Sequence, residues 1–229
     1  MSRQVESKDR ETPCPLCSAP SEAFHRDRSR EYMRCPVCSL VYVPPVHHPG
    51  AVEEKRRYDL HRNDPGDPGY RAFLGLLIDV VVPLLPEGAV GIDYGSGPGP
   101  TVSVMLGERG FDVVDYDPFY APDAGALERG YDFLISTETV EHFHNPGAEW
   151  GRMISLVNGG GLAGVMTGLI KDDQDFSSWR YKDDPTHVCF YSVDTMRWIA
   201  GRYGLRVSFH GERAAVFRKG REASAGKGA

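Results

Sequence analysis

The stretch GIDYGSGPG at residues 91–99 constrains the fold of this chain more than any other segment. A short apolar run ends in Asp93, and glycine then occupies every second position, at Gly95, Gly97 and Gly99. Glycine has no side chain, so such a turn lets a ligand approach the main chain closely. We therefore expect a nucleotide-type site at the carboxyl end of a buried parallel strand.

The segments around this turn alternate between short apolar runs and stretches with helical spacing, which predicts a doubly wound, mostly parallel α/β sheet. Strands are expected at residues 89–94, 111–116, 131–137 and 162–170, with a terminal antiparallel pair at 205–211 and 212–218. Helices are expected at residues 70–86, 101–109, 146–157 and 192–204.

The spacing of the glycines distinguishes three kinds of cofactor site. A phosphate-binding P-loop requires Lys-Ser or Lys-Thr after the glycines, and neither pair is present. A dinucleotide fingerprint requires a third glycine where Pro100 stands. The observed G-x-G-x-G pattern suits a ligand that presses on the turn without a pyrophosphate, and S-adenosylmethionine fits this description.

Carboxylates near the turn are the predicted polar contacts of that cofactor. Asp117 follows the second strand and is expected to accept hydrogen bonds from both ribose hydroxyls, with Asp115 as the alternative. Asp117 is favoured because it lies beyond the end of the expected strand, whereas Asp115 lies within it. Asp93 either reaches the cofactor's ammonium through water or ties down the turn itself.

Four ordered motifs resemble the class I S-adenosylmethionine-dependent methyltransferases: VGIDYGSGPG, VVDYDP, YDFLISTETVEHFHNP and LVNGGGLAGVMT. The resemblance covers roughly residues 70–210 and implies a Rossmann-like methyltransferase fold. It also implies a set of cofactor-binding residues: Asp93, Gly95, Ser96, Gly97, Gly99, Asp117, Pro118, Thr137 and Glu138. One departure is that residues 118–130 are too few for the family's helix and third strand. Asp123 is then the nearest substitute for the acid that contacts adenine, or adenine lies against Phe119.

CPLC at residues 14–17 and CPVC at residues 35–38 place Cys14, Cys17, Cys35 and Cys38 in a C-x2-C-x17-C-x2-C array. Two such pairs complete a closed tetrahedral site, which predicts a structural Zn2+ in a small ribbon. Iron, two disulfides and a redox dithiol are the alternatives. Zinc ribbons ending in a CGLVFVNP-like stretch precede the catalytic domain in some bacterial methyltransferases, and CPVCSLVYVPP is similar. Cys189 is expected to be a small buried residue.

The chain is therefore divided into a zinc ribbon at residues 1–48, a linker at 49–69, a methyltransferase domain at 70–218 and a flexible tail at 219–229. The first residues are polar and do not form a secretory signal, and no apolar run reaches membrane-spanning length. These features predict a cytoplasmic protein that does not enter membranes.

Candidate catalytic residues gather after the last parallel strand, in residues 171–192. His187 is the first candidate for a general base, because an imidazole titrates near neutral pH; alternatively it pins this loop through a main-chain hydrogen bond. His142 either faces the acceptor or packs beside the cofactor. Tyr191, with Trp179 and Tyr181, is expected to line an acceptor pocket or to belong to a lid.

The leading functional hypothesis is methyl transfer to an oxygen, nitrogen or carbon atom of a small molecule. An RNA methyltransferase whose ribbon docks the nucleic acid is the second hypothesis, and a cofactor-binding module without activity is the third. The formal net charge of −6 makes a nucleic-acid partner the weaker choice. Nothing in the sequence points to a particular oligomeric state.

Overall fold

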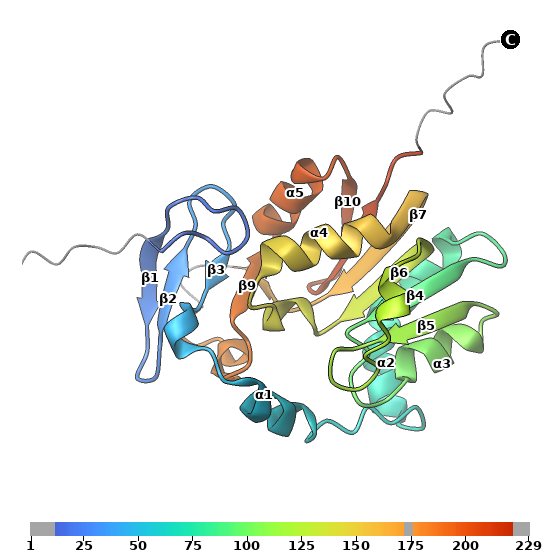
Figure 1. Ribbon diagram of the computed structural model, residues 1–229, viewed down its shortest axis with the longest axis horizontal. Coiled ribbons are helices and arrows are strands. Elements are labelled where there is room, and N and C mark those ends of the chain that lie inside the picture. The colour runs from blue at the N-terminus through green and yellow to red at the C-terminus, as the bar shows by residue number, and fades with distance from the viewer. Residues whose placement is uncertain (1–11, 172–175, 222–229) are drawn as a thin grey trace, which may run out of the picture.

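The computed structural model describes residues 12–171 and 176–221, and its centre is a six-stranded sheet (Figure 1). The strand order is β10-β11-β7-β6-β4-β5. The four strands from β7 to β5 are parallel, whereas β11 is antiparallel to both β7 and β10. This confirms the mostly parallel sheet with a terminal antiparallel pair. The strands are β4 (Val90–Tyr94), β5 (Asp112–Tyr116), β6 (Tyr131–Thr137), β7 (Val157–Met166), β10 (Arg206–His210) and β11 (Ala214–Arg218).

Helices cover both faces of this sheet, as a doubly wound fold requires. In Figure 1, α4 (Pro146–Leu156) and α5 (Val193–Arg202) lie above it, and α2 (Pro68–Val81) and α3 (Thr101–Gly107) lie at the lower right. Two apolar clusters correspond to the two faces. The helical spacing of Tyr70, Phe73, Leu74, Leu77, Ile78 and Val81 predicted a packed helix; the last four are buried in the second cluster, and Tyr70 and Phe73 pack against it partly buried.

Three helices, α2, α4 and α5, begin after residues whose side chains accept main-chain hydrogen bonds. Ser192 forms a capping box with Thr195 at the start of α5, as the sequence predicted for its N-cap. Asn145 caps α4 in the same way, so the HNP segment starts a helix and is not only a turn. Pro100 is the N-cap of α3 and not its first helical residue.

The expected strand at residues 162–170 differs from the observed structure. Strand β7 starts at Val157, directly after α4, and includes the glycine-rich turn, while Leu169–Ile170 forms a separate strand, β8. Glycine allows this extended path, since a Cβ on Gly161 would lie 2.5 Å from the Asp132 carbonyl oxygen.

The shortened segment between β5 and β6 carries no strand of the main sheet. An isolated bridge joins Asp117 to Ala121, and residues 118–130 contain the 3-10 helix η3 (Ala124–Leu127). Strand β5 is therefore an edge strand of the six-stranded sheet. This agrees with the abbreviated segment that the sequence indicated.

A second sheet joins the N-terminal region to the rest of the molecule. Its order is β1-β2-β3-β9-β8. Strand β3 pairs antiparallel with β9, with Tyr42 opposite Cys189, and Figure 1 shows the two strands side by side. The main-chain hydrogen-bonding groups along the edge of β3 are thus paired with a strand from the C-terminal half of the chain. The strands are β1 (Glu22–Arg26), β2 (Glu31–Arg34), β3 (Val41–Tyr42), β8 (Leu169–Ile170) and β9 (Cys189–Ser192).

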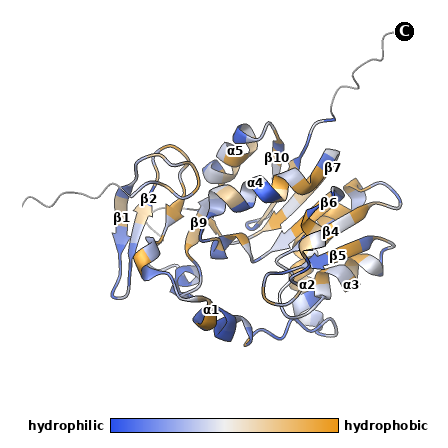
Figure 2. Cartoon of the chain, in the orientation of Figure 1, coloured by the Kyte–Doolittle hydropathy of each residue, from blue (hydrophilic) through white to orange (hydrophobic). Residues whose placement is uncertain are grey.

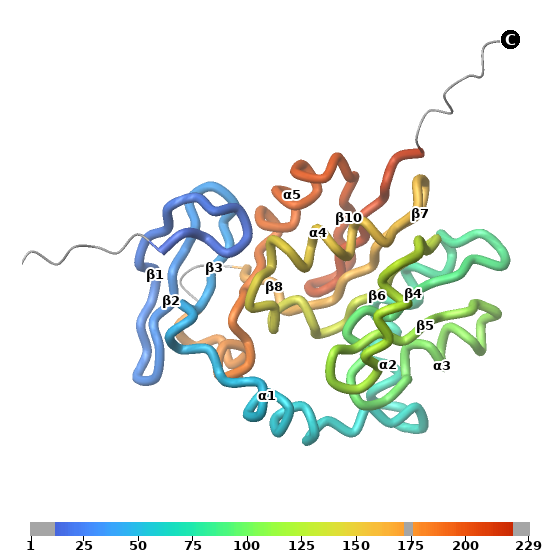
Figure 3. Tube along the Cα trace, viewed as in Figure 1, coloured from blue at the N-terminus to red at the C-terminus, as the bar shows by residue number. Residues whose placement is uncertain are grey.

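The segment expected to be a linker contains the helix α1 (Ala51–Tyr58), which crosses below the gap between the ribbon and the main sheet in the tube view (Figure 3). At the other end, the first residues of the expected tail are fixed, because the Lys219 and Gly220 main chains bond to Gly161 and Gly160. The remainder of the tail, residues 222–229, lies outside the described residues. Within the described ranges, no helix has both the length and the apolar character of a membrane span.

Candidate active site

A cavity of about 650 Å3 opens where β4, β5 and β6 end. Parallel strands of an open sheet bring their following loops together at this edge, which is where ligands bind in such folds. The glycine turn after β4 forms one wall of the cavity. The other walls come from α1, from α2, from the 3-10 helix η4 (Val140–His142) and from the loop that carries Asp184 and His187.

Nearly all of the predicted cofactor-binding residues line this cavity. The exception is Asp93, which lies in β4 and is only 1% exposed. Burial, together with the nearby Asp115 and Asp117, raises the pKa of Asp93 well above its ordinary value. Its Oδ1 accepts no hydrogen bond from the described residues. The lining residues from the predicted set are Gly95, Ser96, Gly97, Gly99, Asp117, Pro118, Thr137 and Glu138.

The Asp117 carboxylate already accepts hydrogen bonds from the main chain. Its Oδ2 accepts from the Gly97 amide at 3.0 Å, and its Oδ1 accepts from the Phe119 and Tyr120 amides at 2.8 and 3.1 Å. These bonds join the glycine turn to the loop after β5. Asp115 points elsewhere and accepts from the Ser103 hydroxyl, so the structure places Asp117 and not Asp115 at the cavity.

Two glycines of the turn are needed by the protein itself. Gly95 has a φ of +85°, and a Cβ there would lie 2.2 Å from the Thr139 side chain. A Cβ on Gly99 would lie 2.2 Å from the main-chain oxygen of Asn63. The sequence-based explanation, that the glycines let a ligand approach the main chain, stays a prediction, since both residues also line the cavity. The space beside Gly99 on the side of the missing Cβ is filled by the segment that precedes α2.

Glu138 stands at the end of β6 in an unusual conformation. Its φ is +48°, in the left-handed region that residues with a side chain rarely adopt. The carboxylate accepts hydrogen bonds from Arg213 at 3.1 and 3.2 Å and from the Tyr181 hydroxyl at 3.2 Å. Burial and the neighbouring Glu141 raise the pKa of Glu138 to about 8.

The two candidate histidines both line the cavity and contact each other, with ring centroids 4.8 Å apart. His187 Nδ1 lies 2.6 Å from the Tyr181 carbonyl oxygen, and His142 Nδ1 lies 3.0 Å from that of Thr186. A carbonyl can only accept, so the proton of each neutral ring is assigned to Nδ1 and Nε2 is left as an acceptor. The two roles considered for His187, loop anchor and base, are therefore compatible.

Burial, and to a lesser extent the adjacent His142, lowers the pKa of His187 to about 3. An unfolded chain binds a proton at this position below about pH 6.5, whereas the folded chain does not. Since the unfolded state then binds more protons, we expect the free energy of unfolding to fall as the pH is lowered from 7 to 5. His187→Gln should flatten that slope in chemical unfolding measurements.

His210→Gln is the control for this experiment, because it removes an imidazole on β10 that lies outside the cavity lining. An unchanged slope in His187→Gln would show that His187 titrates alike in both states and is not held neutral by the fold.

The aromatic residues that were expected at the acceptor pocket lie outside the cavity lining. Tyr191 is fully buried in β9, where its hydroxyl donates to the Val140 carbonyl at 3.0 Å and accepts from Trp150 at 3.3 Å. Its predicted catalytic role is corrected to a structural one, because both polar contacts are made within the core. Trp179 stacks on Tyr181, and the Tyr181 hydroxyl donates a hydrogen bond to the Glu138 carboxylate at 3.2 Å.

Sequence reasoning missed the wall formed by α1 and the residues after it. Glu54 is 7% exposed and accepts a hydrogen bond from His144 Nε2 at 2.8 Å. The Tyr58 ring meets the His142 ring edge to face at 5.1 Å, and His61 also lines the cavity. The segment EEKRRYDLHRN is polar throughout, so its composition gave no sign that one face of it is buried. Phe119 also lines the cavity, whereas Asp123 caps η3 and does not.

A second functional cluster is formed by the four cysteines of the ribbon. Their sulfurs all lie within 4.8 Å of one another, with Cys14 Sγ 3.5 Å from Cys38 Sγ and Cys17 Sγ 3.4 Å from Cys35 Sγ, and all four are free thiols. The two pairs have the same local geometry. In each, the amide four residues after the first cysteine bonds back to its carbonyl, and Ser18 and Ser39 have φ values of +64° and +58°.

This geometry fits a tetrahedral metal site, since two equivalent turns aim four thiols at one point. A hydrogen bond with the Cys38 thiol lowers the pKa of Cys14 to about 6, whereas the same contact raises the pKa of Cys38 and burial raises the pKa of Cys17 to about 11. Cys189 is buried apart from this group, and its thiol donates to the Phe143 carbonyl at 3.2 Å.

Glu141, His142 and His187 also bring three possible ligand atoms within 4.8 Å of one another. However, the Glu141 carboxylate already accepts from the hydroxyls of Thr167 and Tyr181. Glu141 is fully buried, and burial raises its pKa to about 7. The arrangement is better described as a hydrogen-bonded support beneath the two histidines than as a metal site.

Residues 69–208 match the family model described as a methyltransferase domain. The match covers more than half of the chain and includes the glycine turn, Asp117, Glu138 and both histidines. The chain therefore belongs to this family and is a methyltransferase. A search of curated proteins found no match.

Solved structures share the fold at low sequence identity. A methyltransferase from Archaeoglobus fulgidus has a TM-score of 0.52 at 14% identity, covering 65% of this chain and 94% of its own. A Haloferax volcanii putative methyltransferase, solved with the activator Trm112, has a TM-score of 0.51 at 11% identity. The match covers 72% of this chain and 98% of the Haloferax chain. The 1,6-didemethyltoxoflavin N1-methyltransferase of Burkholderia thailandensis has a TM-score of 0.50 at 13% identity. The match covers 87% of this chain and 99% of the Burkholderia chain.

Proposed function

We propose that this protein transfers the methyl group of S-adenosylmethionine to a small molecule held in the cavity. One observation carries the proposal: the glycine turn with Asp117 and the His142–His187 pair line the same cavity. The first group suits an adenosyl cofactor and the second suits an acceptor that must lose a proton. S-adenosylhomocysteine bound to the Burkholderia thailandensis enzyme supports the choice of cofactor by analogy of fold.

In the proposed site, Asp117 would accept hydrogen bonds from the ribose and Phe119 would contact the adenine. Thr137 and Glu138 would bind the amino-acid end, where the hydrogen bonds from Arg213 and Tyr181 hold the Glu138 carboxyl group in place. Bound S-adenosylmethionine supplies an electrophilic methyl carbon. The protein then has to hold the acceptor atom in line with that carbon and exclude water from it.

His187 is the proposed general base. Its Nδ1 proton is engaged by the Tyr181 carbonyl, which leaves Nε2 to take a proton from an acceptor hydroxyl or amine. The lowered pKa keeps this nitrogen unprotonated at neutral pH. His142 is proposed to contact the same acceptor, with Thr186 fixing its ring.

The charges around the cavity favour an acceptor without a phosphate group. Among the described residues, no lysine lines the cavity, and the one lining arginine, Arg152, pairs with Glu149. Phosphates are usually held by several unpaired cations or by free main-chain amides. The carboxylates among the lining residues are Glu54, Asp117, Glu138, Glu149 and Asp184.

Calorimetry on the zinc-loaded protein tests the proposed function. S-adenosylhomocysteine should bind with measurable heat, and its affinity should change little between low and moderate salt. A short RNA hairpin is the comparison ligand. Tight binding of the hairpin that weakens steeply with added salt would favour RNA as the acceptor, because phosphate contacts release counterions. Absence of heat with both S-adenosylmethionine and S-adenosylhomocysteine would overturn the proposal.

We also propose that Cys14, Cys17, Cys35 and Cys38 bind one structural Zn2+. All four positions of a tetrahedral ion would be filled by protein sulfur, which leaves no open site for substrate. The ion would stabilise the ribbon and would take no part in the methyl transfer. Free thiols of this kind persist in a reducing compartment, which is consistent with a cytoplasmic location.

A further inference from the structure

Arg30 lies at the tip of the β1–β2 hairpin, and its side chain is buried against the other half of the molecule. The hairpin tip is hydrophilic, as Figure 2 shows, and Arg28 and Ser29 beside Arg30 are exposed. Arg30 itself is only 7% exposed. A buried arginine is unfavourable unless its N–H groups all find acceptors, so its contacts indicate why it is there.

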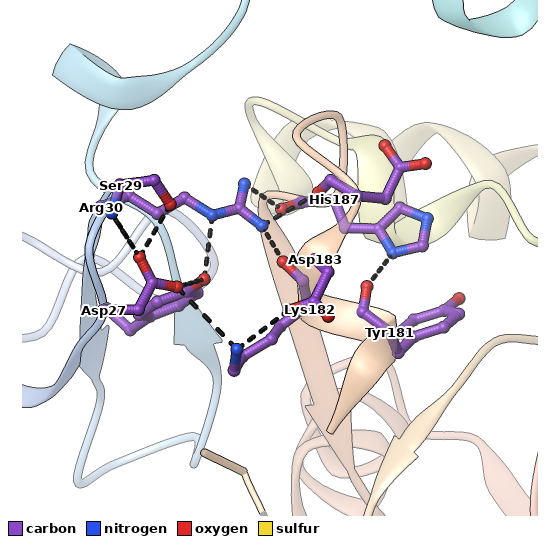
Figure 4. A network of polar contacts seen from close by, with 9 residues as sticks. Asp27, Ser29, Arg30, Tyr181, Lys182, Asp183 and His187 are labelled. Carbon is purple, nitrogen blue, oxygen red and sulfur yellow. Dashed lines mark hydrogen bonds and ion pairs between the residues drawn. The ribbon is translucent and has the colours of Figure 1, made fainter. Parts of the chain in front are cut away.

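The guanidinium of Arg30 is surrounded by acceptors from one loop of the methyltransferase region (Figure 4). Nε donates to the Tyr32 hydroxyl at 2.9 Å, and Nη1 donates to the Pro185 and His187 carbonyls at 3.2 and 3.1 Å. Nη2 donates to the carbonyls of Lys182 and Asp184. Each nitrogen thus has as many acceptors as it carries N–H groups.

The hairpin is built to present this side chain. Asp27 Oδ1 accepts from the Ser29 and Arg30 amides at 2.8 and 2.9 Å, which closes the turn. Its Oδ2 accepts from the Tyr32 hydroxyl at 2.7 Å, and the Tyr32 ring lies under the guanidinium at 5.4 Å. Asp27 therefore holds the main-chain amide of Arg30, and Tyr32 holds its guanidinium.

The loop that Arg30 holds is the one that orients both histidines of the cavity. Carbonyls of residues 182, 184, 185 and 187 face Arg30, whereas those of Tyr181 and Thr186 accept from His187 and His142. Peptide groups are planar and only φ and ψ separate one from the next, so holding the first set of carbonyls restricts the orientations open to the second set. The side chain of Asp184, which lines the cavity, belongs to the same loop.

We propose that Arg30 is a positioning residue through which the metal-binding ribbon sets the geometry of the active-site histidines. It touches neither histidine ring and lies outside the cavity lining. Its role is to hold residues 182–187 so that both rings keep their protons on Nδ1 and present Nε2 to the cavity. The significance of this geometry for catalysis rests on the proposed function, whereas the geometry itself can be measured without cofactor or acceptor.

Nitrogen-15 spectra of histidine-labelled full-length protein report which ring nitrogen carries the proton and can test this role. In the wild type, His142 and His187 should both show the Nδ1–H form. In Arg30→Ala, both rings should become mixtures of the two tautomers, and the His187 and Val188 amides should exchange with solvent at least about tenfold faster, because several charge-assisted hydrogen bonds are lost. Millimolar guanidinium chloride should restore the wild-type spectrum in Arg30→Ala, with sodium chloride as the ionic control.

Two further variants keep the test decisive. Arg28→Ala removes an exposed arginine from the same turn and should leave both the tautomers and the exchange rates unchanged. Arg30→Lys keeps the charge but lacks the planar fork, and it should restore the spectrum only in part. It also replaces Arg30→Ala if that variant fails to bind zinc.

Wild-type histidine spectra in Arg30→Ala, with zinc bound, would overturn the proposal. Binding of S-adenosylhomocysteine is measured in parallel. Since the glycine turn and Asp117 do not contact Arg30, the affinity for S-adenosylhomocysteine should be the same in the wild type and in Arg30→Ala. Failure of the wild type to bind would count against the proposed function and not against the role of Arg30.

Discussion

Cys35→Ser is expected to lose the bound metal and to destabilise far more of the molecule than the ribbon. Cys35 is fully buried within the four-thiol cluster, and a serine hydroxyl is a poor substitute for a thiolate ligand. A ribbon of this size has too little apolar core to fold without its metal. We expect the zinc content to fall from about one ion per chain to near zero and the free energy of unfolding to drop by more than about 4 kcal/mol.

The effect should spread because two connections tie the ribbon to the rest of the fold. Strand β3 pairs with β9, and Arg30 fills the carbonyl cluster of the active-site loop. Metal analysis and thermal unfolding would measure both consequences. Cys189→Ser is the matched control, since its hydroxyl can still donate to the Phe143 carbonyl and it removes no cluster thiol. Full zinc content and unchanged stability in Cys35→Ser would contradict the metal assignment.

Asp117→Ala is expected to weaken binding of S-adenosylhomocysteine by about 100-fold, because two charge-assisted hydrogen bonds to the ribose would be lost. The carboxylate also ties the Gly97 amide to the loop after β5, so part of the loss would come from a looser turn. Asp117→Asn separates the two causes. It keeps an oxygen that can accept from the main chain but removes the charge, and we expect a loss of about tenfold.

Asp123→Ala provides the control for this measurement. Asp123 also accepts a hydrogen bond from a main-chain amide, that of Gly125 at 2.9 Å, but it does not line the cavity. Calorimetry should therefore show less than about a twofold change in affinity. Equal affinities for Asp117→Ala and the wild type would remove Asp117 from the cofactor site and leave Asp115 and Asp93 to be tested.

Local patterns were sufficient to predict most of the secondary structure and one half of the cavity. The glycine turn follows a buried strand because apolar residues before it and glycines within it impose the same geometry in any context. The resemblance to methyltransferases added Pro118, Thr137 and Glu138, which the structure also places on the cavity wall. Cysteine spacing likewise predicted the thiol cluster, since two short turns determine where four sulfurs point.

Predictions failed where a residue's environment depends on distant segments. Tyr191 was expected at the acceptor, but β9 lies between β3 and β8 in the second sheet and its tyrosine is enclosed between Val140 and Trp150. The polar segment after the ribbon was expected to be a linker, but Glu54 and Tyr58 form a wall of the cavity.

The sequence by itself determined the strand-and-turn motif that suits an adenosyl cofactor, the acid that follows it and the four-thiol array, because each depends on spacing within a few residues. Only the tertiary structure decided that the ribbon shares a sheet with β9 and that Arg30 supports the loop carrying His187. Those contacts join residues more than a hundred positions apart. No local propensity encodes them, since they arise when the chain folds back on itself and buried polar groups find their partners.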